Sequence, residues 1–269
     1  MNPIDLKEQL VLAIEASIEA GNVILEIYGS ADFETEFKKD DSPLTLADLE
    51  SNKVIMSYLT KTDIPIISEE KKNFDYSERK NWDVCWMVDP LDGTKEFIKR
   101  NGEFTVNIAL IKNGAPILGV IYVPVTQELY YANVEEGKSY KIMAGSTKEL
   151  PDRLFDKRNQ LSSSEISSST IKVVGSRSHM NEETEQFIQE LKSEGKDVEI
   201  VSKGSSLKFC IVAEGKADIY PRVAPTMEWD TAAGHAICTA IGLKVTNWET
   251  GKDLEYNKKN LLNPFFLVR

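Results

Sequence analysis

The sequence has 269 residues, of which 41% are hydrophobic and 28% charged, the composition of a soluble globular protein. Lys and Arg number 32 against 43 Asp and Glu, so the formal net charge is −11, which disfavours binding to nucleic-acid polymers and anionic lipid. A small anionic substrate is still compatible with this charge, provided that cations or a bound metal reverse the sign in one cleft.

The three cysteines, Cys85, Cys210 and Cys238, are widely spaced and form no CxxC pair. This pattern disfavours a disulfide framework and a thiolate zinc site, so we expect buried thiols in a reducing compartment. No apolar run reaches the roughly 18 residues of a membrane span, and the first residues lack a signal-peptide pattern. We therefore expect a cytoplasmic protein without an integral membrane segment. A peripheral position at the inner membrane and a homodimer stay open.

The N-terminal half mixes predicted helices with a predicted antiparallel sheet. Apolar residues recur at helical spacing over residues 4–28 and again over 45–59, which predicts two amphipathic helices. Residues 64–67 and 83–88 are short, apolar and rich in β-branched or aromatic side chains, so both are predicted strands. From 104 to 131, strand-like runs alternate around turn residues, which predicts an antiparallel meander.

The stretch 144–170 is polar and rich in serine, without sustained periodicity, so we place a junction there. Beyond it, strands and helices alternate as in α/β layering. The predicted strands lie near 171–174, 198–201, 217–220 and 243–246, and the predicted helices near 181–194, 205–214 and 230–241. The sequence thus predicts a layered α/β (α+β) sandwich with an N-terminal part, 1–150, and a C-terminal part, 151–269.

An acidic motif follows the second predicted strand, where residues 89–94 read DPLDGT. The strand fixes Asp89 at its carboxyl end, a proline stiffens the turn, and Gly93 permits a backbone conformation that a side chain would obstruct. Asp89 and Asp92 would then share a small space, where their repulsion raises one pKa unless a divalent cation is bound. Taken alone, the motif is interpreted equally well as an ordinary Asp-rich turn.

Four further carboxylates stand at the ends of predicted elements. Glu69 and Glu70 follow the first strand, a pattern usual for a solvated loop. Asp48 fits a helix capping box, and Asp230 could equally be the N-cap of the helix after it. With the hydroxyl of Thr94, these groups form an oxygen-rich set that suits Mg²⁺ and requires no catalytic histidine. The reaction class that fits is phosphate ester hydrolysis.

Three segments, 69–70 (EE), 89–94 (DPLDGT) and 229–234 (WDTAAG), resemble in their order the inositol monophosphatase superfamily of Mg²⁺-dependent, lithium-sensitive phosphatases. Within it, residues 95–107 and 204–210 resemble the CysQ-type branch, the 3′(2′),5′-bisphosphate nucleotidases. The similarity spans nearly the whole chain. It implies a layered α-β-α-β-α sandwich of the inositol monophosphatase and fructose-1,6-bisphosphatase type.

The resemblance implies a Mg²⁺ site of two or three ions, held mostly by the N-terminal part and completed by one ligand from the C-terminal part. Glu69, Asp89 and the backbone carbonyl of Leu91 would hold the first ion. The second ion would be held by Asp89, Asp92 and Asp230.

The resemblance also implies catalytic roles for three residues. Asp48 and Thr94 would pair to activate the attacking water, and Glu69 would assist through a metal-bound water. A general base must lie within about 3 Å of the proton that it takes, directly or through one water, so the implied roles require these side chains to converge.

On the substrate side, the implied binding residues are Gly93, Thr94, Ser205, Lys208, Arg222 and Asp230. Gly93 and Thr94 would bind the scissile phosphate. The other end of the nucleotide would contact Ser205, Lys208 and Arg222. Such cations would offset the net charge, although solvated surface positions are the commoner fate of Lys and Arg. His179 is interpreted either as approaching the adenine or as an ordinary loop histidine, and His235 is expected to be packed.

The expected activity is removal of the 3′-phosphate of adenosine 3′,5′-bisphosphate to give AMP and phosphate, as part of sulfur metabolism, with 3′-phosphoadenylyl sulfate as a further candidate substrate. An inositol monophosphate or sugar phosphatase is the alternative within the same class. A non-catalytic phosphometabolite-binding protein is the alternative from another class. It is disfavoured because each implied metal position carries a residue able to bind metal.

Overall fold

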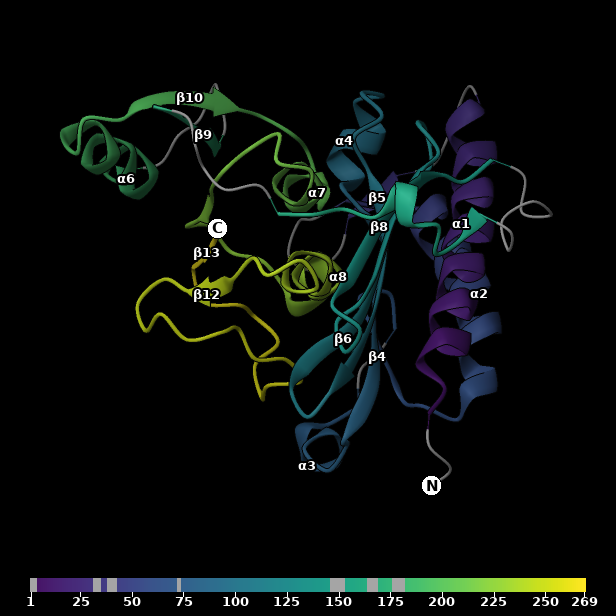
Figure 1. Ribbon diagram of the computed structural model, residues 1–269. Helices are drawn as coiled ribbons and strands as arrows, with labels where there is room; N and C mark the ends of the chain where they lie inside the picture. The colour runs from purple at the N-terminus through teal and green to yellow at the C-terminus, as the bar shows by residue number, and fades with distance from the viewer. Residues whose placement is uncertain are drawn as a thin grey trace.

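Helices and strands alternate in layers in the computed structural model (Figure 1). The structure describes residues 4–30, 35–37, 43–71, 74–145, 153–163, 169–175 and 182–269. Helices α1 (Leu6–Gly29) and α2 (Leu46–Leu59) cover one face of a six-stranded sheet. Helices α7 (Leu207–Ala213) and α8 (Glu228–Thr239) cover the other face. Beyond them lie smaller sheets and α6 (Glu182–Ser193), which completes the predicted α-β-α-β-α sandwich.

The large sheet has the strand order β3-β4-β5-β6-β7-β8. Its strands are β3 (Ile66–Ser68), β4 (Val84–Asp92), β5 (Thr105–Lys112), β6 (Ala115–Val123), β7 (Glu128–Asn133) and β8 (Lys138–Met143). β3 is parallel to β4, and all other neighbours are antiparallel. The predicted meander is confirmed, and it continues into β8, which was not predicted. The expectation that the second strand ends at Val88 is wrong, because β4 continues through a register shift to Asp92.

Both faces of the sheet are buried, which explains why its strands are apolar at successive positions. Along β4, Trp86 and Val88 pack with α1 and α2, whereas Cys85 and Met87 pack with α7 and α8. The small residues of α8 allow a close approach to β6. A Cβ atom at Gly119 would lie only 2.4 Å from a backbone oxygen of α8. The large sheet therefore holds a helix layer tightly on each side.

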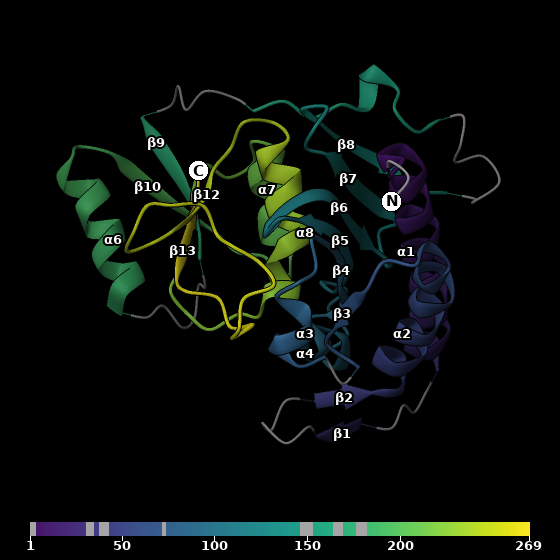
Figure 2. The same ribbon diagram turned by 90° about the horizontal axis from the view of Figure 1, so that it is seen from below.

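The C-terminal half forms two smaller sheets. Parallel strands β9 (Thr170–Val174) and β10 (Asp197–Val201) form one, and β11 (Tyr220–Arg222), β13 (Phe266–Val268) and β12 (Val245–Asn247) form the other, in that order. The strand predicted near 217–220 is displaced towards Arg222, and β13 was not predicted. Seen from below, α6, these sheets, α7 with α8, the large sheet, and α1 with α2 follow one another across the molecule (Figure 2).

Short elements complete the described part of the chain: β1 (Thr35–Phe37), β2 (Pro43–Thr45), η1 (Thr60–Thr62), α3 (Tyr76–Arg79), α4 (Thr94–Ile98) and η3 (Lys157–Asn159). The expected junction at 144–170 lies partly outside the described residues, at 146–152 and 164–168, so the division into 1–150 and 151–269 stays a prediction. Within the described residues, no helix combines the length and the apolar character needed to cross a membrane.

Candidate functional site

The first carboxylate of the site comes from the bulged end of β4. The register between β4 and β5 shifts between Asp89 and Asp92, which bends the chain while it stays in the sheet. Within the bend, the N–H of Leu91 donates a hydrogen bond of 3.1 Å to Oδ1 of Asp89. From α2, the hydroxyl of Ser51 donates to the carbonyl oxygen of Pro90 at 2.6 Å. These contacts fix Asp89, which is only 1% exposed, inside the protein.

Glu69 comes from the neighbouring strand. β3 runs parallel to β4, with Ser68 beside Val88, so the carboxyl ends of the two strands lie at the same edge of the sheet. The N–H of Glu69 donates to the carbonyl oxygen of Val88 at 3.2 Å. The parallel pairing therefore brings the sequence-predicted pair Glu69 and Asp89 together, although 20 positions separate them in the printed sequence.

Two more carboxylates, Asp48 and Asp230, are each the third residue of a helix, and the two helices lie on opposite faces of the sheet. Oδ2 of Asp48 accepts hydrogen bonds from the N–H and the hydroxyl of Thr45, at 2.7 and 2.6 Å. Oδ2 of Asp230 accepts one from the N–H of Met227 at 2.8 Å. The predicted capping box at Asp48 is confirmed. Asp230 is not the N-cap, because α8 begins earlier than predicted and Met227 takes that position.

The acidic cluster consists of Glu69, Asp89 and Asp230, whose contributing carboxylate oxygens all lie within 4.8 Å of one another. Burial, followed by the charges of Glu69 and Asp92, raises the pKa of Asp89 well above its usual range. Burial, followed by the charge of Asp92, likewise raises the pKa of Asp230. Carboxylates this close and this shielded from water repel one another unless a cation lies among them. A donor set made only of hard oxygens fits a divalent metal ion.

Asp92 is oriented by two residues to which the sequence analysis gave no role. The hydroxyl of Ser206 donates to Oδ2 of Asp92 at 2.6 Å and accepts a hydrogen bond of 2.8 Å from the amide of Asn107. The same hydroxyl oxygen lies 2.9 Å from the carbonyl oxygen of Asp230. Ser206 therefore links the end of β4 to the first turn of α8. Both lie in the segments 95–107 and 204–210 that resemble the CysQ-type branch, but that resemblance was not used to assign either of them a contact with Asp92.

Gly93 and Thr94 connect the acidic cluster to the short helix α4. Gly93 has a φ of +95°, and a Cβ there would lie 3.2 Å both from the carbonyl oxygen of Glu103 and from Cβ of Ser205. Both the conformation and the space therefore favour glycine. The hydroxyl of Thr94 lies 3.1 Å from Oδ1 of Asp48 and donates to it. The structure thus brings together the Asp48 and Thr94 pair that the sequence resemblance implies.

Leu91 lies between the two aspartates of β4 and is only 2% exposed. Its N–H is engaged by Asp89, as described above, and its carbonyl oxygen lies 3.4 Å from the hydroxyl of Thr94. The carbonyl is therefore directed to the same side as the hydroxyl that meets Asp48. Its role as a metal ligand stays a prediction.

A cavity of about 270 Å³ joins the acidic residues to a cationic wall. Asp92 and Asp230 line one side, and Lys208 and Arg222 line another. A larger cavity of about 560 Å³ shares Lys208 and Arg222 with the first and extends along the loop at 202–204. The two cavities together offer an elongated ligand an end beside Asp92 and Asp230 and an end with the cations Lys208 and Arg222, near which Glu96 and Glu103 also line the larger cavity.

Local contacts orient the residues of the basic end. Nζ of Lys208 donates to the carbonyl oxygen of Ser205 at 2.9 Å, and burial lowers the pKa of this lysine against the opposing effect of Asp92. Ser205 has a φ of +43°, and its buried hydroxyl has no hydrogen-bond partner within the described residues. Arg222 donates to the carbonyl oxygen of Pro225 at 3.2 Å. A buried polar atom without a partner is costly, so the hydroxyl of Ser205 marks a place where a ligand could bind.

A third cavity, of about 500 Å³, places an apolar wall beside the carboxylates. Met227, Trp229 and Leu262 line it, together with Glu69 and Thr94. Leu262 is 42% exposed, so its side chain is available to a ligand in this cavity.

His235 is not a member of the acidic cluster. His235 is packed, as expected: it is 5% exposed, and Nδ1 lies 3.0 Å from the hydroxyl of Tyr256. Burial lowers the pKa of His235 to about 3, so the ring is neutral near pH 7. His179 lies outside the described residues.

A sequence model of the inositol monophosphatase family matches residues 5–264. A curated protein named 3′(2′),5′-bisphosphate nucleotidase CysQ, from Salmonella typhimurium, is 48% identical over 253 residues, which cover 93% of this chain and 94% of that protein. The Escherichia coli K12 protein of the same name is 47% identical with the same coverage. Among solved structures, CysQ from Bacteroides thetaiotaomicron is 47% identical and has a TM-score of 0.87, covering 99% of this chain and 98% of its own.

Proposed function

The chain belongs to the inositol monophosphatase family, and we propose that it is a 3′(2′),5′-bisphosphate nucleotidase that removes the 3′-phosphate of adenosine 3′,5′-bisphosphate to give AMP and phosphate. The observation that carries this proposal is the 48% identity to a nucleotidase of that name over 93% of the chain. The geometry supports it, because Asp230 of the acidic cluster lines the same cavity as Lys208 and Arg222. A doubly phosphorylated nucleotide presents the matching pair of anionic groups.

We assign Mg²⁺ to the acidic cluster, with two or three ions per site. Glu69, Asp89 and Asp230 would hold the ions, with Asp92 and the carbonyl of Leu91 as further ligands. When bound, the ions would neutralise the phosphate and lower the pKa of water. The buried position of Asp89, among other carboxylates whose charges raise its pKa, supports this assignment.

Asp48 and Thr94 are suited to hold and move the proton of the attacking water. Because the hydroxyl of Thr94 donates to Asp48, its oxygen can accept a hydrogen bond from a water molecule. A proton lost by that water can pass to Thr94, while the proton of Thr94 passes to Oδ1 of Asp48. The other oxygen of Asp48 caps α2, so the carboxylate cannot rotate away without losing two hydrogen bonds.

The remaining residues bind and orient the substrate. We assign the scissile phosphate to the backbone of Gly93 and Thr94, beside the acidic cluster, where Asp230 would contact the substrate as well. The second phosphate would meet Ser205, Lys208 and Arg222, which border the two connected cavities. Charge-assisted hydrogen bonds from these cations would offset the net charge of −11.

The proposed function is tested by comparing initial rates of phosphate release from adenosine 3′,5′-bisphosphate and from inositol 1-phosphate, each with Mg²⁺ and with a chelator. We expect the nucleotide to be preferred by at least about tenfold in kcat/KM, because only the nucleotide offers a second anion to the basic wall. A preference for inositol 1-phosphate would instead identify an inositol phosphatase. Tight nucleotide binding without phosphate release would identify a binding protein. Loss of activity in the chelator is expected for either phosphatase.

A further inference from the structure

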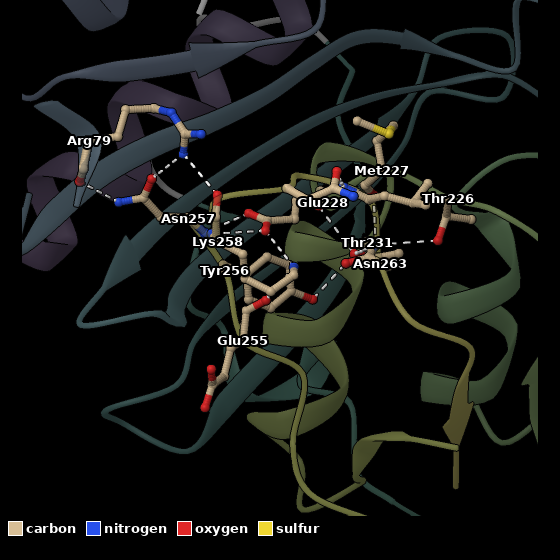
Figure 3. A network of polar contacts seen from close by, with 12 residues as sticks. Arg79, Thr226, Met227, Glu228, Thr231, Glu255, Tyr256, Asn257, Lys258 and Asn263 are labelled. Carbon is tan, nitrogen blue, oxygen red and sulfur yellow. Dashed lines mark hydrogen bonds and ion pairs between the residues drawn. The ribbon is translucent and has the colours of Figure 1, made fainter. Parts of the chain in front are cut away.

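An ion pair between the buried carboxylate of Glu228 and the partly exposed Lys258 holds the start of α8, and the proposed reaction does not use it. Glu228 is the first residue of α8, and its side chain has no exposed surface. Oε1 accepts hydrogen bonds from the backbone N–H and the ammonium group of Lys258, at 3.1 and 2.5 Å (Figure 3). Oε2 accepts one from the N–H of Asn257 at 2.5 Å. One carboxylate thus satisfies three donors of the segment that follows β12.

The same segment is tied to the N-terminal half of the chain by Arg79. This residue ends α3 and is only 4% exposed. Its guanidinium donates to the side-chain oxygen of Asn257 at 2.7 Å and to the carbonyl oxygen of Lys258 at 3.2 Å. In return, the amide of Asn257 donates to the carbonyl oxygen of Arg79 at 2.8 Å (Figure 3). Asn257 has a φ of +60°, so these contacts hold a left-handed turn in place.

Asn263 holds the other side of the same helix start. Its side-chain amide donates to the carbonyl oxygen of Met227 at 2.8 Å and to the hydroxyl of Thr231 at 2.9 Å (Figure 3). The N–H of Glu228 donates to the carbonyl oxygen of Leu261 at 2.9 Å. The first turn of α8 is therefore fixed from two directions by the C-terminal segment.

This fixation matters for the acidic cluster because its members come from two different layers. Glu69 follows β3 and Asp89 lies within the adjacent strand β4, so backbone pairing sets their spacing. Asp230 comes from α8, so its distance from the other two depends on contacts between layers, which include the link from Asp92 through Ser206. Metal ligands must lie within a few tenths of an ångström of their required distances. A shift of the first turn of α8 would therefore change metal affinity before it unfolded the protein.

We propose that Glu228 is a positioning residue for the metal site, because its buried carboxylate, paired with Lys258, fixes the first turn of α8 and with it Asp230. This inference rests on the metal-dependent function proposed above. An apolar side chain could fill the same volume, but it would leave the N–H groups of Asn257 and Lys258 buried without a partner. The loop would then have to rearrange, and the helix start would move with it.

The test compares Glu228→Gln with Glu214→Gln in the full-length protein. Glu214 is a matched control, since its side chain is 10% exposed and pairs with Lys141 and Lys216, but it lines none of the three cavities of the site. The measurements are Mg²⁺ binding to metal-free protein by isothermal titration calorimetry, kcat at saturating Mg²⁺, and the thermal midpoint in chelator.

We expect Glu228→Gln to raise the dissociation constant for Mg²⁺ by about 10-fold or more, while kcat at saturating Mg²⁺ changes by less than about threefold. Glu214→Gln is expected to lower the thermal midpoint without changing the dissociation constant for Mg²⁺. If Glu228→Gln lowers the thermal midpoint and leaves Mg²⁺ binding unchanged, its role is only structural and the proposal is overturned.

A double-mutant cycle tests whether Glu228 acts through Asp230. In an Asp230→Asn background, adding Glu228→Gln should change Mg²⁺ binding by less than about twofold. If Glu228→Gln weakens Mg²⁺ binding as much in the Asp230→Asn background as in the wild type, Glu228 does not act through Asp230 and the proposal is overturned. Should Glu228→Gln fail to fold, Lys258→Met takes its place, and Lys258→Arg is expected to restore Mg²⁺ binding. Calorimetry requires no substrate, so a wild-type protein that cleaves no nucleotide would overturn the proposed function alone.

Discussion

The acidic and the basic sides of the cleft are built in different ways. On the acidic side, backbone N–H groups anchor the carboxylates at element ends: that of Leu91 holds Asp89, and that of Met227 holds Asp230. On the basic side, Lys208 and Arg222 donate to loop carbonyls and border open cavities. Both sides stand on regular elements, since Lys208 lies in α7 and Arg222 in β11, and the difference lies in the partners of the side chains. We expect the acidic side to govern the chemical step and the basic side to govern the choice of substrate. The two properties should therefore respond to different substitutions.

The largest expected effect is at the acidic side. Asp89→Asn should lower turnover at saturating Mg²⁺ by more than about 10²-fold, because it removes a ligand from the centre of the cluster. In chelator, its thermal midpoint should not fall below that of the wild type, since the substitution removes a buried charge that other carboxylates repel. Steady-state kinetics and thermal melting check both parts. If the variant turns over substrate as fast as the wild type, Asp89 is not a metal ligand of the site.

A smaller loss of activity is expected from substitutions in the pair Asp48 and Thr94, which we propose transfers the proton of the attacking water. Thr94→Val should lower kcat by about 10²-fold with little change in KM, because the hydroxyl that donates to Asp48 is lost. Thr94→Ser keeps the hydroxyl and serves as the control, with kcat within about fivefold of the wild type. Equal losses in the two variants would show that the methyl group, rather than the hydroxyl, is what matters.

On the basic side, Lys208→Met should raise KM for adenosine 3′,5′-bisphosphate by about tenfold and leave the dependence on Mg²⁺ unchanged. The effect should shrink for 3′-AMP, which lacks the second phosphate. Lys203→Met is the matched control, because Lys203 borders the same large cavity but pairs with Glu103 at 3.0 Å. If KM rises equally for both substrates, Lys208 does not bind the second phosphate.

The smallest expected effect lies away from both sides and concerns stability. Burial lowers the pKa of His235 to about 3, from an ordinary value of 6.5, so between these values the unfolded chain binds a proton that the folded chain does not. This histidine should therefore make the free energy of unfolding fall as pH drops below 6.5, by about 1.4 kcal/mol at pH 5.5. The free energy of unfolding is measured with urea at pH 7.5 and at pH 5.5, for the wild type and for His235→Gln. The contribution of His235 is the difference between the two proteins in how much this free energy changes with pH. A pH dependence that is identical in the two proteins would contradict it.

Sequence patterns predicted the parts of the fold and site that depend on near neighbours. Helices α1 and α2 follow from apolar spacing, and the capping box at Asp48 follows from its distance to Thr45. Strand β8 was missed although it has six residues, because two lysines and a serine interrupt its apolar pattern, and β13 has only three residues. The bulge after Asp89 was missed too, since its cause is the pairing of β4 with β5.

Some site contacts lay beyond sequence reasoning because their partners are far apart in the chain. Ser206 gains its role from Asp92 and Asn107, and Arg79 gains its role from Asn257. Each of these side chains has several possible partners in an unfolded chain. Only the packed arrangement of the layers selects one.

The amino-acid sequence by itself determined which oxygen-bearing side chains this protein has at the ends of its strands and helices, because local periodicity and capping depend on residues within one or two turns. Tertiary structure alone decided that Asp230 meets Glu69 and Asp89 within 4.8 Å. That distance depends on how closely α8 packs on the large sheet and, as we propose, on the pairing of the buried Glu228 with Lys258. Packing of this kind is a property of the whole fold, since every contact in it joins segments that the chain itself keeps apart.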